Sequence, residues 1–138
     1  MEPDAYRAEL AVNNPPTVMA RGEKKQLRVQ VKNISRTDWP TNGLDPRYKL
    51  RSSDDDMYRM YLGNHWLDNA SEKVVVPDDG RAALPDVIAA GESVTVSIAV
   101  NAPPNPGEYI LEFDLVQENV VWFAVRGSQT AKYKVRVE

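Results

Sequence analysis

Residues 106–116 read PGEYILEFDLV, and this stretch decides the fold class of the chain. Its large apolar side chains recur at every second position, at Tyr109, Leu111, Phe113 and Leu115. That period is typical of a β-strand with one face in a core, because successive side chains of a strand point to opposite faces. The proline-rich corner before Tyr109 is also where immunoglobulin-like sandwiches carry a tyrosine corner. We therefore expect an antiparallel strand here, packed in a sandwich.

The same alternation of apolar and polar residues recurs along the rest of the chain. It predicts further strands over residues 27–31, 47–51, 94–100 and 133–137, and less regular strands over 57–68 and 74–76. Valine is the commonest residue, and β-branched side chains suit a pleated surface better than a helix. Near the start, Tyr6 and Leu10 suit either a helical turn capped by Asp4 or a strand. We favour the strand, because residues 6–12 also fit period two.

Many short strands, regular turns and no long helix predict a two-layer sandwich or a barrel, and the Tyr109 corner favours the sandwich. The Cys-Trp-Cys framework of antibody domains is missing, because the chain has no cysteine. The predicted fold class is all-β, an immunoglobulin-like antiparallel β-sandwich of about seven to nine strands with no disulfide. No internal repeat or low-complexity segment divides the sequence, so residues 1–138 are expected to form a single immunoglobulin-like domain.

Composition excludes several classes of function. Without cysteine there is no thiolate catalysis and no common zinc finger, and the single histidine excludes any site that needs two imidazoles. Lys plus Arg number 17 against 20 for Asp plus Glu, and the net charge of -3 argues against nucleic acid as a partner. The longest strongly apolar stretch, residues 120–125, is far shorter than the roughly 18–20 residues of a spanning helix. We therefore expect no membrane insertion.

Four segments of the chain resemble a known group of bacterial modules. They are VQVKNISRTDWP (29–40), LP with AGES (84–85 and 90–93), AP with PGEY (102–103 and 106–109) and FDLVQE with VWF (113–118 and 121–123). The first resembles a segment of bacterial immunoglobulin-like modules, which include cell-adhesion-related domains, and of the tryptophan-rich domain of an autophagy receptor. The others are similar to modules attached to bacterial glycosyltransferases and other enzymes of cell-surface polysaccharide synthesis. The likeness covers roughly residues 25–127 and departs from the pattern at Glu118-Asn119, where a glycine is expected.

The resemblance implies a non-catalytic accessory or binding module of a larger bacterial polypeptide. It implies glycan, or the neighbouring domain of the same chain, as the partner in surface polysaccharide biosynthesis, and a glycosyltransferase as the parent protein. The alternative is a structural protein-interaction or spacer domain with no glycan contact. The resemblance leaves open whether the module works in the cytoplasm or at the cell envelope.

The aromatic residues supply the candidate ligand contacts, because sugars stack their apolar faces on aromatic rings while polar side chains bind the hydroxyls. Trp122 follows a tight return from the 109–116 strand, and that return sets its ring near Asp114. Trp66, beside His65, and Tyr61 form a second cluster. The candidate binding residues are therefore Trp122, Asp114, Trp66 and Tyr61. The alternative is that these side chains belong to a covered sheet face.

Metal binding and catalysis are not expected. The acidic run over residues 54–56 lacks the spaced order of a calcium loop and is expected to be a solvated turn, and Asp78-Asp79-Gly80 is expected to be a hairpin turn. Asp114 and Glu118 would lie about 13 Å apart along one strand, too far for a glycosidase pair without a bend. No phosphate-binding loop or nucleophile elbow occurs. We expect no enzyme, no cofactor and no metal site, and we expect Trp39 to pack at the end of the sandwich.

Overall fold

The alternating stretches of the sequence form strands in the computed structural model, which describes residues 3–39, 59–85, 87–117 and 121–138. In chain order, the strands are β1 (Ala8–Asn13), β2 (Val18–Met19), β3 (Lys24–Asn33), β4 (Met60–Asp68), β5 (Val74–Val76), β6 (Arg81–Ala83), β7 (Ser93–Asn101), β8 (Gly107–Gln117), β9 (Val121–Trp122) and β10 (Ala131–Val137). Two short 3-10 helices, η1 (Pro3–Ala5) and η4 (Phe123–Arg126), lie among the described residues.

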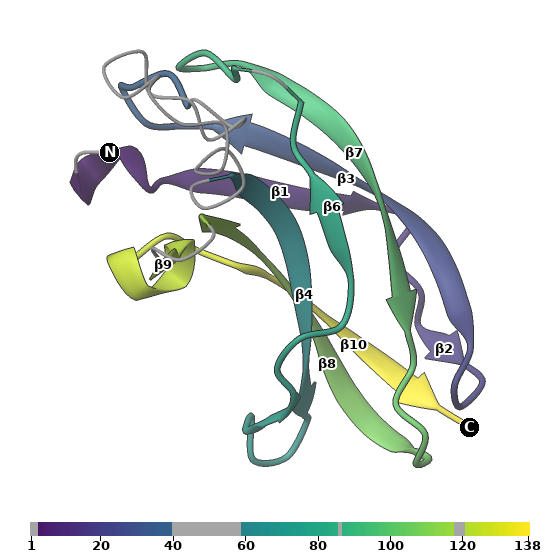
Figure 1. The fold of residues 1–138 in the computed structure, drawn as a ribbon. Coiled ribbons are helices and arrows are strands. Elements are labelled where there is room, and N and C mark those ends of the chain that lie inside the picture. Colours follow the sequence, from purple (N-terminus) through teal and green to yellow (C-terminus); the bar gives the residue numbers. More distant parts are fainter. Residues whose placement is uncertain (1–2, 40–58, 86, 118–120) are drawn as a thin grey trace.

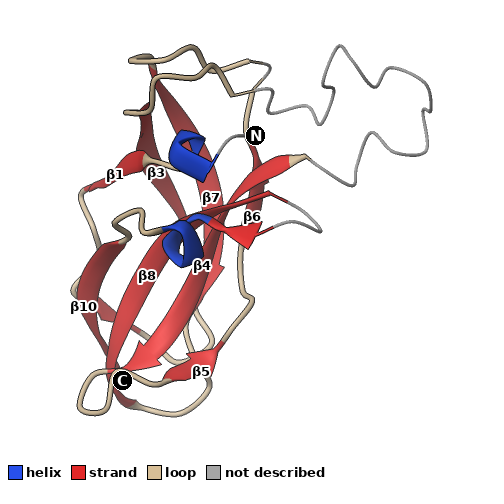
Figure 2. Cartoon of the chain, turned by 90° about the vertical axis from the view of Figure 1, so that its left-hand side faces the viewer, coloured by secondary structure: helices blue, strands red, loops and turns tan. Residues whose placement is uncertain are grey.

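The strands build two sheets that form the layers of a sandwich (Figure 1). The smaller sheet has the order β1-β3-β7, and the larger has the order β2-β10-β8-β4-β5, with β6 paired to β4 and β9 paired to β8. Figure 2 shows β10, β8 and β4 side by side in the larger sheet. The predicted immunoglobulin-like sandwich is confirmed. Pairing among the described strands is antiparallel as expected, except that the two-residue strand β2 runs parallel to β10.

The core lies between the sheets and consists of the predicted apolar rows. On β3, Leu27, Val29 and Val31 are buried while the residues between them are exposed. On β8, Leu111 and Phe113 are fully buried. Removing each such side chain from water contributes roughly 1.5–3 kcal/mol, so these rows are the main stabilising feature of the fold. Strands β3, β4, β5, β7, β8 and β10 confirm six of the predicted strands, and the expectation for residues 47–51 lies outside the described residues.

Two aromatic residues fix the ends of the sandwich as the sequence predicts. The Tyr109 hydroxyl donates a hydrogen bond to the Asn105 carbonyl over 2.7 Å, which is the bond that defines a tyrosine corner. Trp39 is fully buried, its Nε1 donates to the Ala5 carbonyl over 2.8 Å, and its ring meets Phe123 edge to face. Trp39 therefore has the packing role expected of it.

The structure decides two local expectations, one at the N-terminus and one at residues 78–80. At the N-terminus the strand reading is confirmed from Ala8 onward, because β1 pairs with β3 along its whole length, and helical structure is confined to η1. The hairpin expected at residues 78–80 is wrong. Strands β5 and β6 do not pair with each other but both pair with β4, one after the other along the same edge. The segment between them bridges these two pairings.

Candidate functional site

The candidate site lies on the outer face of the larger sheet, where the odd-numbered side chains of β4 point away from the core. The register places Tyr61, Val116 and Trp122 in one row across β4, β8 and β9, and Gly63 beside Asp114 in the next row. The odd positions of β4 face outward because Leu62 and Trp66, on the even positions, are buried in the core.

Trp122 crosses this face diagonally and lies against Gly63. A Cβ atom added at Gly63 would come within 2.9 Å of Cη2 of the indole, so only glycine leaves room for the ring. The imidazole of His65, two residues further along β4, has its centroid 4.4 Å from that of the indole. Trp122 remains half-buried rather than covered, which leaves part of the ring at the surface.

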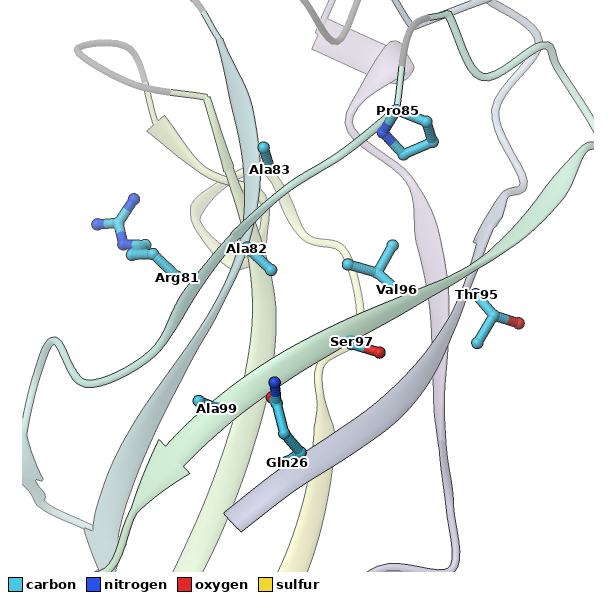
Figure 3. Close-up of a pocket in the computed structure, with 9 residues that line it drawn as sticks. All are labelled: Gln26, Arg81, Ala82, Ala83, Pro85, Thr95, Val96, Ser97 and Ala99. Carbon is cyan, nitrogen blue, oxygen red and sulfur yellow. The ribbon is translucent and has the colours of Figure 1, made fainter. Parts of the chain in front are cut away.

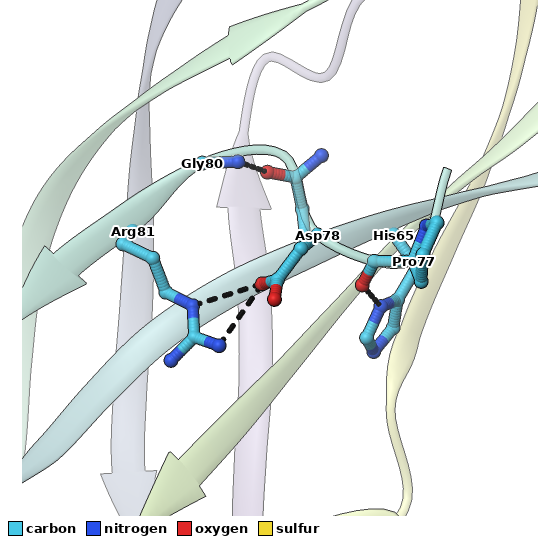
Figure 4. A network of polar contacts seen from close by, with 6 residues as sticks. His65, Pro77, Asp78, Gly80 and Arg81 are labelled. Carbon is cyan, nitrogen blue, oxygen red and sulfur yellow. Dashed lines mark hydrogen bonds and ion pairs between the residues drawn. The ribbon is translucent and has the colours of Figure 1, made fainter. Parts of the chain in front are cut away.

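Arg81 on β6 places its guanidinium carbon 4.9 Å from the centre of the Trp122 ring, within the range of a cation–π contact. Asp78 holds the guanidinium through Nε at 3.1 Å and Nη2 at 2.9 Å (Figure 4). The imidazole of His65 is held by a hydrogen bond to the same segment, because its Nδ1 donates to the carbonyl of Pro77 (Figure 4). The segment between β5 and β6 thus orients both polar groups beside the indole. We call Tyr61, Gly63, His65, Arg81 and Trp122 the Trp122 patch.

Asp114 lies next to Gly63 of this patch and holds the backbone that follows Trp122. Only 2% of the residue is exposed, and its carboxylate accepts the backbone N–H of Leu115 at 2.8 Å and of Ala124 at 3.1 Å. Burial raises the pKa of the Asp114 carboxyl to about 7, against the opposing effect of these two N–H groups. By holding Ala124, Asp114 fixes η4, which directly follows Trp122.

The structure brings three of the four sequence candidates together and separates the fourth. Trp122, Asp114 and Tyr61 share the outer face, whereas Trp66 is fully buried on the opposite, core-facing side of β4. Nε1 of Trp66 donates to Oδ2 of Asp79 over 3.0 Å. Positions 61 and 66 have opposite parity, and parity alone separates them once a strand is assigned.

Sequence reasoning missed Arg81, Gly63 and Asp79. Asp79 was assigned to a turn, yet its carboxylate joins the two sheets. Its Oδ2 accepts from Trp66 Nε1, from Asn64 Nδ2 at 2.9 Å and from the Asn101 backbone N–H at 2.9 Å, and its Oδ1 accepts from Asn101 Nδ2 at 3.0 Å. The signal for Gly63 was present, since a glycine inside a strand often marks a close approach. Arg81 lacked any such signal, because its place depends on how β6 pairs.

Two classes of feature are absent from the part of the chain that the structure describes. The helices of this part are the short 3-10 segments η1 and η4, and neither could span a bilayer. Within the same ranges, no three acidic, histidine or cysteine side chains group as metal ligands would. The acidic run at 54–56 and residue Glu118 lie outside the described residues. Chemically, the Trp122 patch offers ring stacking, a guanidinium and an imidazole.

No protein-family model and no curated protein sequence matches the chain. Solved structures do share its fold. The CARDB domain of a Pyrococcus furiosus protein, in its solution structure, has a TM-score of 0.50 at 14% identity, with 95% of each chain covered. A crystal structure of that domain with di-metal ions has a TM-score of 0.50 at 15% identity, with 96% of this chain and 90% of that one covered. The sporulation control protein Spo0M of Bacillus subtilis has a TM-score of 0.55 at 14% identity. The match covers 96% of this chain but only 49% of Spo0M, so this chain spans about half of that protein.

Proposed function

We propose that this chain is a non-catalytic accessory module that binds glycan through the Trp122 patch. Its immunoglobulin-like sandwich is the fold of the CARDB domains, which supports a modular role. We also propose that residues 1–138 act as one domain of a larger bacterial polypeptide engaged in surface polysaccharide biosynthesis, with a glycosyltransferase as the parent. The reading frame that surrounds this segment tests that part, since an attached transferase domain is the expected finding.

The observation that carries the proposal is the fixed, half-exposed indole of Trp122 between two oriented polar groups. A sugar ring can stack on the part of the indole that Arg81 and His65 leave exposed, while the guanidinium over the ring and Nε2 of His65 beside it bind hydroxyls. Tyr61 lies in the same cross-strand row, two strands from Trp122, and adds a second aromatic ring to this face. Such a site has little rotamer entropy to lose on binding, because Asp78 and Pro77 already hold its polar groups.

Asp114 has a positioning role in this proposal. Its carboxylate is buried and occupied by two backbone N–H groups, so it acts on the ligand only through η4 and Trp122. Trp66 has no ring face at the surface and is left out of the contact set.

A spacer or protein-interaction domain with no glycan contact is the second candidate function. The exposed valines Val74 and Val75 of β5 favour it, with 52% and 47% of their surface accessible at one edge of the larger sheet. Exposed apolar residues on an edge strand are suited to contact with another protein surface. Concentration-dependent size, abolished by Val74→Lys, is the result expected for this alternative.

Titration of the nitrogen-15-labelled chain with oligosaccharides tests the glycan proposal. The probes are neutral β-glucan, chitin and uronic-acid oligosaccharides, each raised to about 10 mM to reach weak sites. We expect the indole N–H signal of Trp122 and the backbone signals of Tyr61 and His65 to shift with one of them. Trp122→Ala is expected to weaken that binding about tenfold or more.

The matched control is Val125→Ala. Val125 is 74% exposed on η4, three residues from Trp122, so this variant also removes an apolar side chain from the same region. Its binding is expected to equal that of the parent chain. Flat spectra with every probe, or equal weakening by both variants, would exclude the Trp122 patch as a glycan site.

A further inference from the structure

The two edges of the smaller sheet are finished in different ways. On β1, the outward backbone N–H groups toward the two ends of the strand are capped by side chains of a loop and a strand of the other sheet, and only that of Leu10 between them has no cap among the described residues. Ser128 Oγ accepts from Ala8 N at 3.0 Å, and the Tyr133 hydroxyl accepts from Val12 N at 2.8 Å. Capped backbone groups cannot pair with another chain, so this edge is protected.

The opposite edge, β7, lacks that protection along most of its length. Two hydrogen bonds at the ends of the β3–β7 pairing set its pattern: Asn33 N donates to the Glu92 carbonyl, and Ala102 N donates to the Glu23 carbonyl. In this pattern the backbone N–H and C=O groups of the even-numbered residues of β7 point toward β3. The odd-numbered N–H and C=O groups therefore point to the open side. Asn101 N is capped by Asp79, whereas the N–H groups of Thr95 and Ser97 have no hydrogen-bond partner among the described residues.

A groove of about 580 Å³ runs along this edge, between β7 and β6 (Figure 3). Leu84 N donates a hydrogen bond to the Met60 carbonyl, in register with the β4–β6 pairing. The backbone groups of the even-numbered residues of β6 therefore point toward β4, and those of Ala83 point toward the groove. The groove closes at Gly80, where an added Cβ would lie 2.3 Å from the Ala99 carbonyl oxygen. Two strand edges thus face each other and diverge from a common point.

The groove's side chains define what it can hold. Its β7 side carries the small residues Thr95, Ser97 and Ala99, and the half-buried Ala82 and the nearly buried Val96 border them on the inner side. The β7 side of the groove has no charge, bulge or proline that would repel an incoming strand, whereas the opposite side carries Arg81 and Pro85. The exposed backbone selects an extended chain, because a strand is the partner that matches alternate N–H and C=O groups.

The charge beside the groove is positive. Arg28 on β3 lies opposite Ser97 on one side and Asn13 on the other, both uncharged, and it forms no ion pair among the described residues. Lys24 lies on the same face of β3, opposite Asn101 at the closed end of the groove, where Asn101 is bonded to Asp79. Because Ser97 is small, the side chain of Arg28 can extend over β7 toward a strand added at the edge.

We propose that the β7 edge binds an extended segment of another protein by strand addition, and that this segment alternates apolar with acidic residues. Its apolar side chains would lie beside Ala82 and the edge of Val96, and an acidic side chain opposite Ser97 would meet Arg28. A second copy of this chain fits less well, because pairing β7 with β7 brings two rows of Arg28 and Lys24 onto one face. The proposal does not depend on the Trp122 patch.

Backbone amide exchange in the labelled full chain tests the proposal. The probe is a synthetic peptide of about seven residues that alternates valine and glutamate, a length that matches the open part of β7 before Ala99. We expect the amides of Thr95 and Ser97 to exchange about tenfold more slowly when the peptide is bound, and those of Ala8 and Val12 to stay unchanged. A peptide with lysine in place of glutamate, and one N-methylated on alternate residues, are expected to bind at least about tenfold more weakly.

Two variants of the edge complete the experiment. Ser97→Pro removes one outward N–H without touching a β3 bond, and Ser97→Glu repels the acidic peptide while keeping the backbone intact, should the proline variant fail to fold. Both are expected to weaken binding about tenfold, whereas Ala11→Glu, which adds the same charge on the far strand β1, is not. Unchanged exchange at Thr95 and Ser97 with about 1 mM peptide would overturn the proposal. So would equal binding of the lysine peptide, or protection of both amides by self-association without any peptide.

Discussion

The indole of Trp122 occupies the space that any side chain at Gly63 would need. A Cβ built on Gly63 would lie 2.9 Å from Cη2 and 3.1 Å from Cζ3 of that ring. These residues belong to β9 and β4, which are separated by β8. The position of the aromatic ring in the candidate site is therefore set by a missing side chain two strands away.

Gly63→Ala is expected to push the indole off the sheet. Overpacking of this kind destabilises a fold by roughly 1–3 kcal/mol, although alanine itself is acceptable in a strand. The displaced ring would also lose its contact with His65, so the near-ultraviolet circular dichroism of Trp122 should change. Urea unfolding measures the loss of stability, and near-ultraviolet circular dichroism together with the indole N–H chemical shift measures the displacement of the ring.

A double-mutant cycle separates this clash from an intrinsic effect of alanine. In the Trp122→Ala background the ring is gone, and Gly63→Ala is expected to cost close to nothing. Equal costs in both backgrounds would show that the two residues do not compete for space.

Asp114 is expected to make stability depend on pH. Its folded pKa is about 7 against an ordinary value of 3.8, so the folded state holds the proton more tightly than the unfolded chain. Its contribution to stability is therefore fully present below about pH 3.8 and is lost as the pH rises through about 7. The amide side chain of the Asp114→Asn variant stays neutral at every pH, as the protonated carboxyl is at acidic pH, so this substitution should flatten the decline of the free energy of unfolding between about pH 4 and 8.

Urea unfolding of both proteins at several values across about pH 4–8 checks this prediction. Asp114→Asn also loses one of the two N–H acceptors, which costs about 1–3 kcal/mol at every pH and shifts the whole curve without changing its slope. The same slope in the two proteins would mean that Asp114 does not carry the pH dependence.

The fold was predictable because its strands repeat one simple physical pattern. In β3, β7, β8 and β10 the apolar residues occupy every second position, and only one face of a strand can meet the core of a two-layer sandwich. The sequence also predicted a tyrosine corner at Tyr109, and the hydrogen bond from its hydroxyl to the Asn105 carbonyl confirms it.

The pairing of β5 and β6 with β4 was not predictable, because it depends on Asn64. That side chain accepts the N–H of Gly80 at 2.7 Å and donates to Asp79, which holds the linking segment at the edge of β4.

The candidate site was predictable only where it follows strand parity. Trp122 and Asp114 share a face because the return after β8 is short, as the sequence indicated. Trp66 was grouped with Tyr61 by nearness in the sequence, yet an odd separation sends the two side chains to opposite faces. Arg81 reaches Trp122 through a pairing that connects segments distant in the chain, and no local pattern encodes such a pairing.

Asp79 is expected to be a major stabilising residue, because it joins β4 to the end of β7. An amide can keep its oxygen where Oδ2 accepts three bonds, but Asp79→Asn then leaves Nδ2 of Asn101 without an acceptor and removes the charge that strengthens the other bonds, so it should cost about 1–3 kcal/mol. The neighbouring Asp78 is exposed and bonds only Arg81 among the described residues. Asp78→Asn is therefore the control, with an expected cost below about 1 kcal/mol. Similar midpoints of thermal unfolding for the two variants would contradict the assigned role of Asp79.

Tyr133→Phe is expected to open the protected edge of β1. The variant removes the hydroxyl that accepts the Val12 N–H at 2.8 Å, so unfolding should become easier by about 1 kcal/mol and the Val12 amide should exchange faster. Tyr109→Phe is the matched control, because it also removes one tyrosine hydroxyl and its bond, to Asn105, but leaves β1 untouched. The two variants should lose similar stability, and only Tyr133→Phe should speed exchange at Val12. Faster exchange in both would mean that Val12 reports global opening and that the Tyr133 hydroxyl is not a specific cap.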